Sequence, residues 1–167
     1  MYFEKNIILS FVLSFTLILN CIPQAFASNE TNGEIVAEAI LGKSLVKTGF
    51  ETVEMGNDKG ANVATRDGSQ CWLMDKLQGD AKAYINFTFD DKFKENKNDG
   101  SVYEFEFEYY DSGNGYIRIE YDALSRENET MGTIYTKNEK TWKTAKYSVS
   151  DALFSKRLGG KYDFRLS

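Results

Sequence analysis

Three stretches of the chain alternate apolar and polar residues one by one, and this period of two constrains the fold more than any other feature. They are residues 83–89, 102–110 and 116–122. The second stretch places aromatic side chains such as Phe105 on one face and glutamates such as Glu106 on the other. Successive side chains of a strand leave the pleat in opposite directions, so the pattern predicts half-buried antiparallel strands.

Polar, glycine-bearing segments separate these stretches and break the rest of the chain into further short runs. No long helical pattern competes with them. The sequence therefore predicts an all-β domain over 45–167, a two-sheet antiparallel β-sandwich of about eight strands. The additional strands are expected at 50–55, 61–66, 131–137, 142–149 and 162–166.

The loop 111–115 carries two glycines, which favour a tight connection between the strands on either side of it. We therefore expect 102–110 and 116–122 to pair directly, with Glu108 opposite Arg118. Other pairs in this register set like charges opposite each other, which is unfavourable. Two interpretations of the acidic face stay open: an ordinary solvated surface, or a polar platform that binds ligand hydroxyls.

Residues 1–27 have the layout of a secretory signal peptide: one lysine, an apolar stretch over 7–19, and small residues at Ala25 and Ala27. We predict export, cleavage after Ala27 and an extracellular location. The alternatives are a membrane anchor, for which the apolar run is short and interrupted, and lipidation of Cys21. Residues 28–44 are then a flexible or partly helical lead.

Charge and composition exclude several function classes. The formal net charge of -5 argues against a nucleic-acid partner, which needs clustered Lys and Arg. The chain has no His, which removes Ser–His catalysis, His-based metal sites and the commonest general base. After cleavage only Cys71 remains, so the mature domain has no intramolecular disulfide and folds by burial alone.

A series of blocks in the mature chain resembles a known family. The Trp-Lys-Thr block at 142–144 and the Asp-Phe-Arg block at 163–165 are its most specific parts. In their order and spacing, the blocks resemble a jelly-roll domain of the galactose-binding-like, carbohydrate-binding-module type, found on secreted bacterial polysaccharide-degrading enzymes. The blocks lie at 84–91, 107–115, 119–122, 141–147, 151–154 and 159–165.

This resemblance implies a non-catalytic module that binds a polysaccharide or other glycan, with no membrane contact after cleavage. A structural or adhesive module of a larger extracellular enzyme is the alternative, with a catalytic domain in a longer parent protein as partner. Some relatives hold a structural Ca²⁺. The family usually adds a final strand after the Asp-Phe-Arg strand, which the residues up to Ser167 do not include. The domain is thus expected to be a truncated piece or to lack its last strand.

Sugar recognition needs aromatic rings that stack on pyranose C–H groups, with charged or amide side chains around them. Trp72 follows a polar loop and is either a core residue or a ligand platform. Several Asp residues at strand ends are expected to make turn hydrogen bonds, with calcium coordination as the alternative. The candidate ligand-binding residues are Trp72, Tyr84, Glu108, Tyr110, Tyr116, Arg118 and Trp142.

An enzymatic alternative is a glycosidase that uses two carboxylates, such as Glu106 and Glu120. These two groups would have to flank one glycosidic bond. Outward, solvated glutamates give little means of raising one carboxyl pKa for acid catalysis, so we expect no enzyme.

Overall fold

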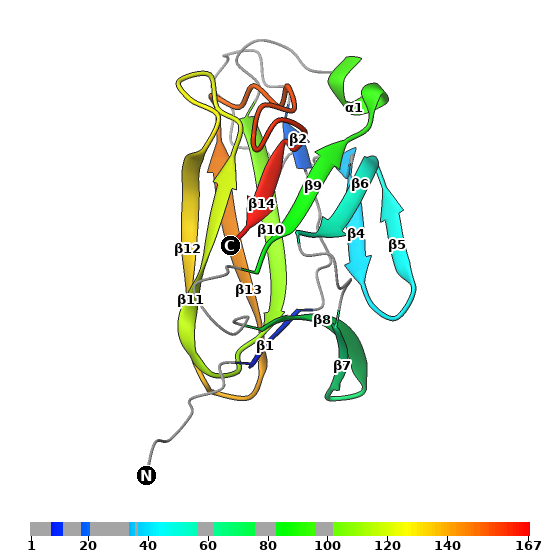
Figure 1. Cartoon of the computed structure of the whole chain (residues 1–167), viewed down its shortest axis with the longest axis vertical. Helices are drawn as coiled ribbons and strands as arrows, with labels where there is room; N and C mark the ends of the chain where they lie inside the picture. Colours follow the sequence, from blue (N-terminus) through cyan, green and yellow to red (C-terminus); the bar gives the residue numbers. More distant parts are fainter. Residues whose placement is uncertain are drawn as a thin grey trace, which may run out of the picture.

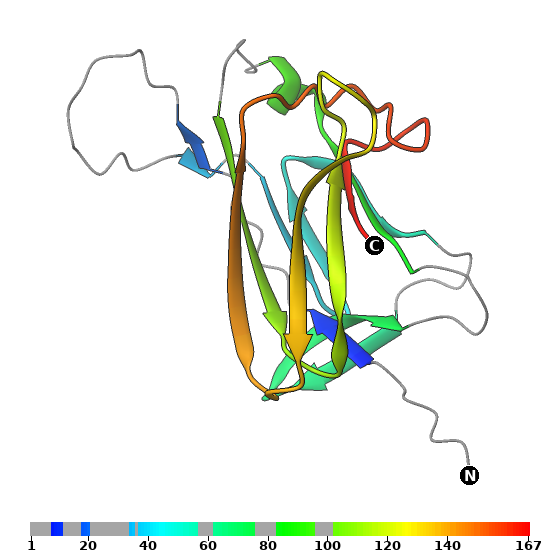
Figure 2. The ribbon, with the colours of Figure 1, turned by 90° about the vertical axis from the view of Figure 1, so that its left-hand side faces the viewer.

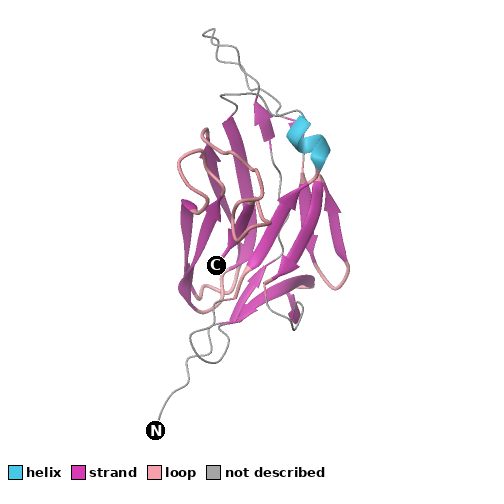
Figure 3. Ribbon diagram, turned by 45° about the horizontal axis from the view of Figure 1, so that its top comes forward, coloured by secondary structure: helices cyan, strands magenta, loops and turns pink. Residues whose placement is uncertain are grey.

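The computed structural model describes residues 8–11, 18–20, 34–35, 37–56, 62–75, 83–95 and 102–167. Its regular structure is almost entirely antiparallel β, with one short helix, α1 (Asp91–Glu95), in the described part (Figure 3). The two larger sheets are seen from the side in Figure 2, and buried side chains from both belong to one hydrophobic core. The predicted all-β sandwich is therefore confirmed, and its finer assignment as a jelly roll stays a prediction.

The first sheet has five strands in the order β12, β11, β14, β9 and β6 (Figure 1). The short strand β14 lies in its middle, antiparallel to both β11 and β9. Each of its five strands overlaps a strand predicted from the sequence. Their bounds are β6 (Phe50–Met55), β9 (Ile85–Phe89), β11 (Asn114–Tyr121), β12 (Glu129–Lys137) and β14 (Phe164–Leu166).

The second sheet runs in the order β3, β2, β10, β1, β8 and β7, and β13 pairs with β10. A separate hairpin of β4 (Glu38–Leu41) and β5 (Leu45–Thr48) packs beside the sandwich. The strands of the second sheet are β1 (Ile8–Phe11), β2 (Ile18–Asn20), β3 (Glu34–Ile35), β7 (Asn62–Arg66), β8 (Ser69–Asp75), β10 (Val102–Tyr110) and β13 (Trp142–Val149).

The N-terminal part of the chain differs from the sequence prediction. The helical character expected before Gly42 is wrong: β4 is a strand that buries Ala39 and Leu41 and exposes Ile40. Two strands, β1 and β2, fall within the predicted export leader and pair with β8 and β10. Cleavage and export stay predictions. No described helix has the length and apolar character needed to cross a membrane.

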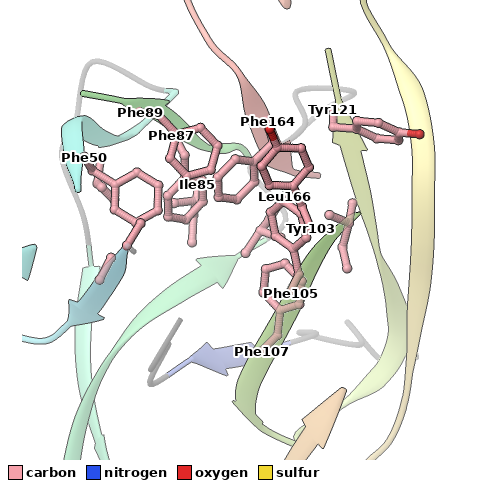
Figure 4. Close-up of a cluster of buried hydrophobic side chains, with 14 of the residues drawn as sticks. Phe50, Ile85, Phe87, Phe89, Tyr103, Phe105, Phe107, Tyr121, Phe164 and Leu166 are labelled. Carbon is pink, nitrogen blue, oxygen red and sulfur yellow. The ribbon is translucent and has the colours of Figure 1, made fainter. Parts of the chain in front are cut away.

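A cluster of phenyl rings joins the two sheets (Figure 4). Phe87 on β9 and Phe164 on β14 stack with 4.3 Å between ring centroids and 4° between planes. Phe105 on β10 meets Phe164 edge-on at 5.5 Å and 78°. All three rings are buried, and the alternating pattern predicts this for Phe87 and Phe105. Such pairs add about 0.5–1.5 kcal/mol each beyond the area that they remove from water.

The predicted hairpin between the second and third alternating stretches is wrong. They form β10 and β11, which belong to different sheets, so the loop between them crosses the sandwich. Glu106 instead lies opposite Lys146 on β13, with an ion pair of 2.6 Å. Glu120 lies opposite Arg165 on β14, with an ion pair of 2.8 Å. Each glutamate therefore meets a cation, and the like-charge contacts of the predicted register do not form.

The fully buried carboxylate of Asp111 fixes this crossing. Its Oδ1 accepts hydrogen bonds from the backbone N–H groups of Lys137 (2.8 Å) and Asn138 (3.0 Å), and its Oδ2 pairs with Lys143 Nζ at 2.6 Å. Burial alone raises the pKa of Asp111, but the bonds from Lys143 and the two N–H groups outweigh it and hold that pKa below its usual value. Asp111 thus ties the crossing loop to the turn between β12 and β13.

Two further buried carboxylates hold the loop before β14 in an unfavourable backbone conformation. Phe154 and Lys156 have φ angles of 45° and 61°, which side-chain-bearing residues rarely adopt. Asp122 accepts the Ser155 N–H at 2.7 Å, and Asp163 accepts the Lys156 N–H at 2.9 Å. These contacts confirm the expectation that Asp residues at strand ends make turn hydrogen bonds.

The replacement Phe87→Ala should lower the free energy of unfolding by about 3–5 kcal/mol, because it empties the centre of the aromatic core. Urea denaturation followed by tryptophan fluorescence measures this change. The matched control is Leu124→Ala, whose side chain is exposed and whose effect should stay within about 0.5 kcal/mol. Equal losses in both variants would contradict the described core.

The replacement Asp111→Asn should destabilise the protein in a pH-dependent way. The native pKa of Asp111 lies below its unfolded value, so its contribution is complete above about pH 4 and is lost as the pH falls through the native pKa. The free-energy difference between wild type and variant should therefore shrink between about pH 7 and about pH 3. Urea denaturation at both pH values tests this. Asp67→Asn, in an exposed turn, is the control, and a constant difference for Asp111→Asn contradicts the prediction.

Candidate functional site

The outer face of the five-stranded sheet brings together three of the seven candidate residues: Tyr84, Tyr116 and Arg118. On β11, Ile117 and Ile119 are fully buried, so the strand's alternation points Tyr116 and Arg118 away from the core. Tyr84 comes directly before β9, beside the other strands of the same face. These three positions define the candidate site.

An exposed pair of tyrosines stands at the open end of this face. Tyr116 on β11 lies directly opposite Tyr135 on β12. Their rings are 6.4 Å apart between centroids and tilted by 51°. The two residues remain 59% and 68% exposed, although large aromatic side chains are buried on average. The pair offers apolar ring surface that no described part of the chain covers.

A row of polar side chains crosses the same face beside the tyrosines. In register, Arg165 lies between Glu120 on one neighbouring strand and Asn86 on the other. Arg165 Nε donates to Glu120 Oε2 at 2.8 Å, and its guanidinium carbon lies 4.6 Å from the centre of the Tyr84 ring. Tyr84 is therefore partly covered by this cation.

The far end of the face is closed by the turn before β14. Lys161 Nζ pairs with Glu54 Oε1 at 2.9 Å, and the Tyr162 hydroxyl donates to the same carboxylate. Thr88 Oγ1 donates to the Lys161 carbonyl at 2.9 Å. The bond from Tyr162, followed by that from Lys161, holds the pKa of Glu54 below its usual value. The accessible part of the face is thus the end formed by β11 and β12.

Arg118 lies next to the tyrosine pair, opposite Thr133. Its backbone N–H and carbonyl both bond to Ser167, at 2.8 and 2.9 Å. Its guanidinium makes no ion pair with any side chain in the described part of the chain. The five N–H donors of this group are therefore available to a ligand.

Three other candidate residues, Glu108, Tyr110 and Trp142, lie on the other sheet. Tyr110 was expected on an exposed face, and this is wrong: it is 7% exposed, and its hydroxyl donates to the Lys140 carbonyl at 2.9 Å. The half-buried Trp142 covers its ring edge-on at 5.3 Å, and Arg66 lies 6.0 Å from the ring centre. Tyr110 and Trp142 thus pack against each other, apart from the three residues on the first sheet.

Trp72 is a core residue, so its role as a ligand platform is not supported. It lies on β8, opposite Val63 of β7, and its ring is buried. The indole Nε1 donates to the Gly42 carbonyl at 2.9 Å. Its ring therefore holds the β4–β5 hairpin against the sheet, which explains why an aromatic residue follows the polar turn.

The carboxylate pair of the glycosidase alternative is also separated. Glu106 lies on β10 of one sheet and is half-buried, whereas Glu120 lies on β11 of the other sheet and is buried beside Arg165, so the expectation of a solvated glutamate is wrong for Glu120. Each is neutralised by its own cation, Lys146 and Arg165. Two carboxylates on opposite outer faces cannot flank one glycosidic bond. That pairing is wrong, while the absence of enzymatic activity stays a prediction.

The aspartates offered for calcium have other partners. Asp122 pairs with Arg157 at 2.7 Å, and Asp163 accepts the Phe89 N–H at 2.8 Å. Among the described residues, no group of three or more acidic or Cys side chains gathers where it could hold a metal ion. Structural Ca²⁺ stays a prediction drawn from the family resemblance.

Sequence reasoning missed Tyr135, the partner of Tyr116. The segment 131–137 was expected to be a strand, and its alternation places Tyr135 and Thr133 on one face and the buried Ile134 on the other. Pairing β11 with β10 instead of β12 hid the contact. A register that matched Glu120 with a cation would have excluded that pairing.

Truncation to Ala should lower the free energy of unfolding much more at Tyr110 than at Tyr116. Tyr110→Ala removes a buried ring and should lower the free energy of unfolding by about 3 kcal/mol. Tyr116→Ala removes an exposed ring and should change it by no more than about 0.5 kcal/mol. Urea denaturation of both variants checks this. A comparable loss in Tyr116→Ala would mean that its ring belongs to the core and not to a surface site.

The chain matches no family model, no curated protein and no solved structure. The resemblance to carbohydrate-binding jelly-roll domains accordingly stays a prediction.

Proposed function

We propose that this protein is an exported, non-catalytic module that binds a polysaccharide on the outer face of the β12–β11–β14–β9–β6 sheet. The observation that carries the proposal is the exposed pair of Tyr116 and Tyr135, aligned opposite each other on neighbouring strands. Apolar side chains grouped in the open on a small domain commonly mark an interaction site. Two rings on a rigid sheet suit the C–H faces of sugar rings in an extended chain.

The polar surroundings of the tyrosines support the same ligand class. Arg118 and Thr133 lie opposite each other, two residues along their strands from the tyrosine pair. Their side chains supply hydrogen-bond donors and an acceptor to the hydroxyl groups of a sugar. Glu120 and Arg165 continue the polar row toward Tyr84. A sugar needs apolar contact on its ring face and hydrogen bonds at its edge, and this face offers both within neighbouring register positions.

Strand placement also favours binding without an induced change of shape. Tyr116 and Arg118 lie within β11, where both pair with β12, and the Arg118 backbone also bonds to Ser167 on its other side. Their backbone is therefore held by the sheet, and little conformational freedom is lost when a ligand binds.

Affinity electrophoresis in native gels that contain soluble xylan, galactan or polygalacturonate tests the proposal. We expect the wild-type protein to be retarded by at least one polymer. The double variant Tyr116→Ala/Tyr135→Ala should lose that retardation, because stacking on the rings is lost. Leu124→Ala, which removes another exposed apolar side chain, is the control and should be retarded like wild type. Unchanged retardation of the double variant would falsify the proposed site.

A further inference from the structure

Two cations on the β11–β12 hairpin bracket the exposed tyrosines on the same face. Lys137, opposite Asn114, is two residues from Tyr135 along β12. Arg118, opposite Thr133, is two residues from Tyr116 along β11, toward the opposite end of the hairpin. Strand alternation places both side chains outward with the two rings between them. The register positions of the two cations are offset by four residues, which corresponds to about 13 Å along the hairpin.

Neither cation is neutralised within the described part of the chain. The carboxylates of this region already have partners: Glu120 pairs with Arg165, and Glu139 pairs with Lys143 at 2.8 Å. No ion pair involves Arg118 or the Lys137 ammonium among the described residues. The hairpin face therefore carries free positive charge on a protein whose net charge is -5.

Resting on the proposed function, we infer that the polysaccharide bound here carries carboxylates, as a uronate polymer does. A linear chain that lies along the hairpin places its sugar rings on Tyr116 and Tyr135 and its carboxylates at the two cations. The planar guanidinium of Arg118 matches a carboxylate with two parallel hydrogen bonds, and Lys137 supplies a point charge at the other end. A neutral glycan would leave both charges unused.

A nucleic acid fits these observations less well, although it also combines stacking bases with negative charge. Its binding is driven by many phosphate contacts to clustered Lys and Arg. The hairpin face has two free cations, and the protein as a whole repels a dense polyanion. Carboxylates spaced along a sugar chain match the few, separated charges better.

The test compares polygalacturonate with highly methyl-esterified pectin, which has the same sugar backbone with most carboxylates blocked. We expect retardation of the wild-type protein by polygalacturonate, weakening by about tenfold with the esterified polymer and declining with added salt. Arg118→Gln/Lys137→Gln should bind polygalacturonate about tenfold more weakly and should lose clearly less affinity for the esterified polymer, for which only the hydroxyl contacts of Arg118 are removed. The control Lys43→Gln removes an exposed cation from the β4–β5 turn and should bind both like wild type.

The possible results separate this inference from the proposed function. Equal binding of both polymers, lost in Tyr116→Ala/Tyr135→Ala but kept in Arg118→Gln/Lys137→Gln, overturns the charge inference and leaves glycan binding in place. Binding of neither polymer overturns the charge inference, and retardation by xylan or galactan then decides the proposed function separately. Tighter binding of single-stranded DNA than of polygalacturonate overturns both. An unchanged thermal transition in each variant ensures that the losses arise at the surface.

Discussion

Aromatic packing between the two sheets is the contact on which the rest of the structure depends. Phe105 reaches from β10 to the stacked rings of Phe87 and Phe164, and all three are buried. Cys71 is buried, and no disulfide joins residues in the described part of the sandwich. Because burial alone joins the layers, the strands must present their apolar faces inward without interruption, and this leaves the opposite faces free for polar and aromatic side chains.

Three buried carboxylates fix the loops that connect the strands of the core. Asp111 anchors the crossing between the sheets and binds the Lys137 N–H at the end of β12. Asp122 and Asp163 hold the backbone of the loop before β14. A buried acceptor without a donor is costly, so these three side chains fix where the chain turns. The hairpin that presents Tyr116 and Tyr135 is therefore held at one end by a charge and on its inner face by the core.

The sequence predicted the strands and their inward faces well, since Phe105 and Phe87 obey a strict period of two. Which strands pair with each other was predicted poorly, because the two glycines in the loop 111–115 are compatible both with a hairpin and with a crossing between sheets. The decisive contacts lie far apart in the chain, as between Glu106 and Lys146. The same limitation explains why Tyr116 was recognised as a site residue but its partner Tyr135 was not.

One irregularity in β12, a β-bulge, separates the tyrosine pair from the turn between β11 and β12. Ile119 faces Gly132 while the next residue, Glu120, faces Thr130, so Met131 is an extra residue that packs toward the core. The bulge lies between the β11–β12 turn and the tyrosine pair. Changes of length in that turn can be taken up at Met131 without rotating Tyr135 to the other side of the sheet. The outward orientation of Tyr135 therefore depends on its pairing with Tyr116 and not on the residues beyond the bulge.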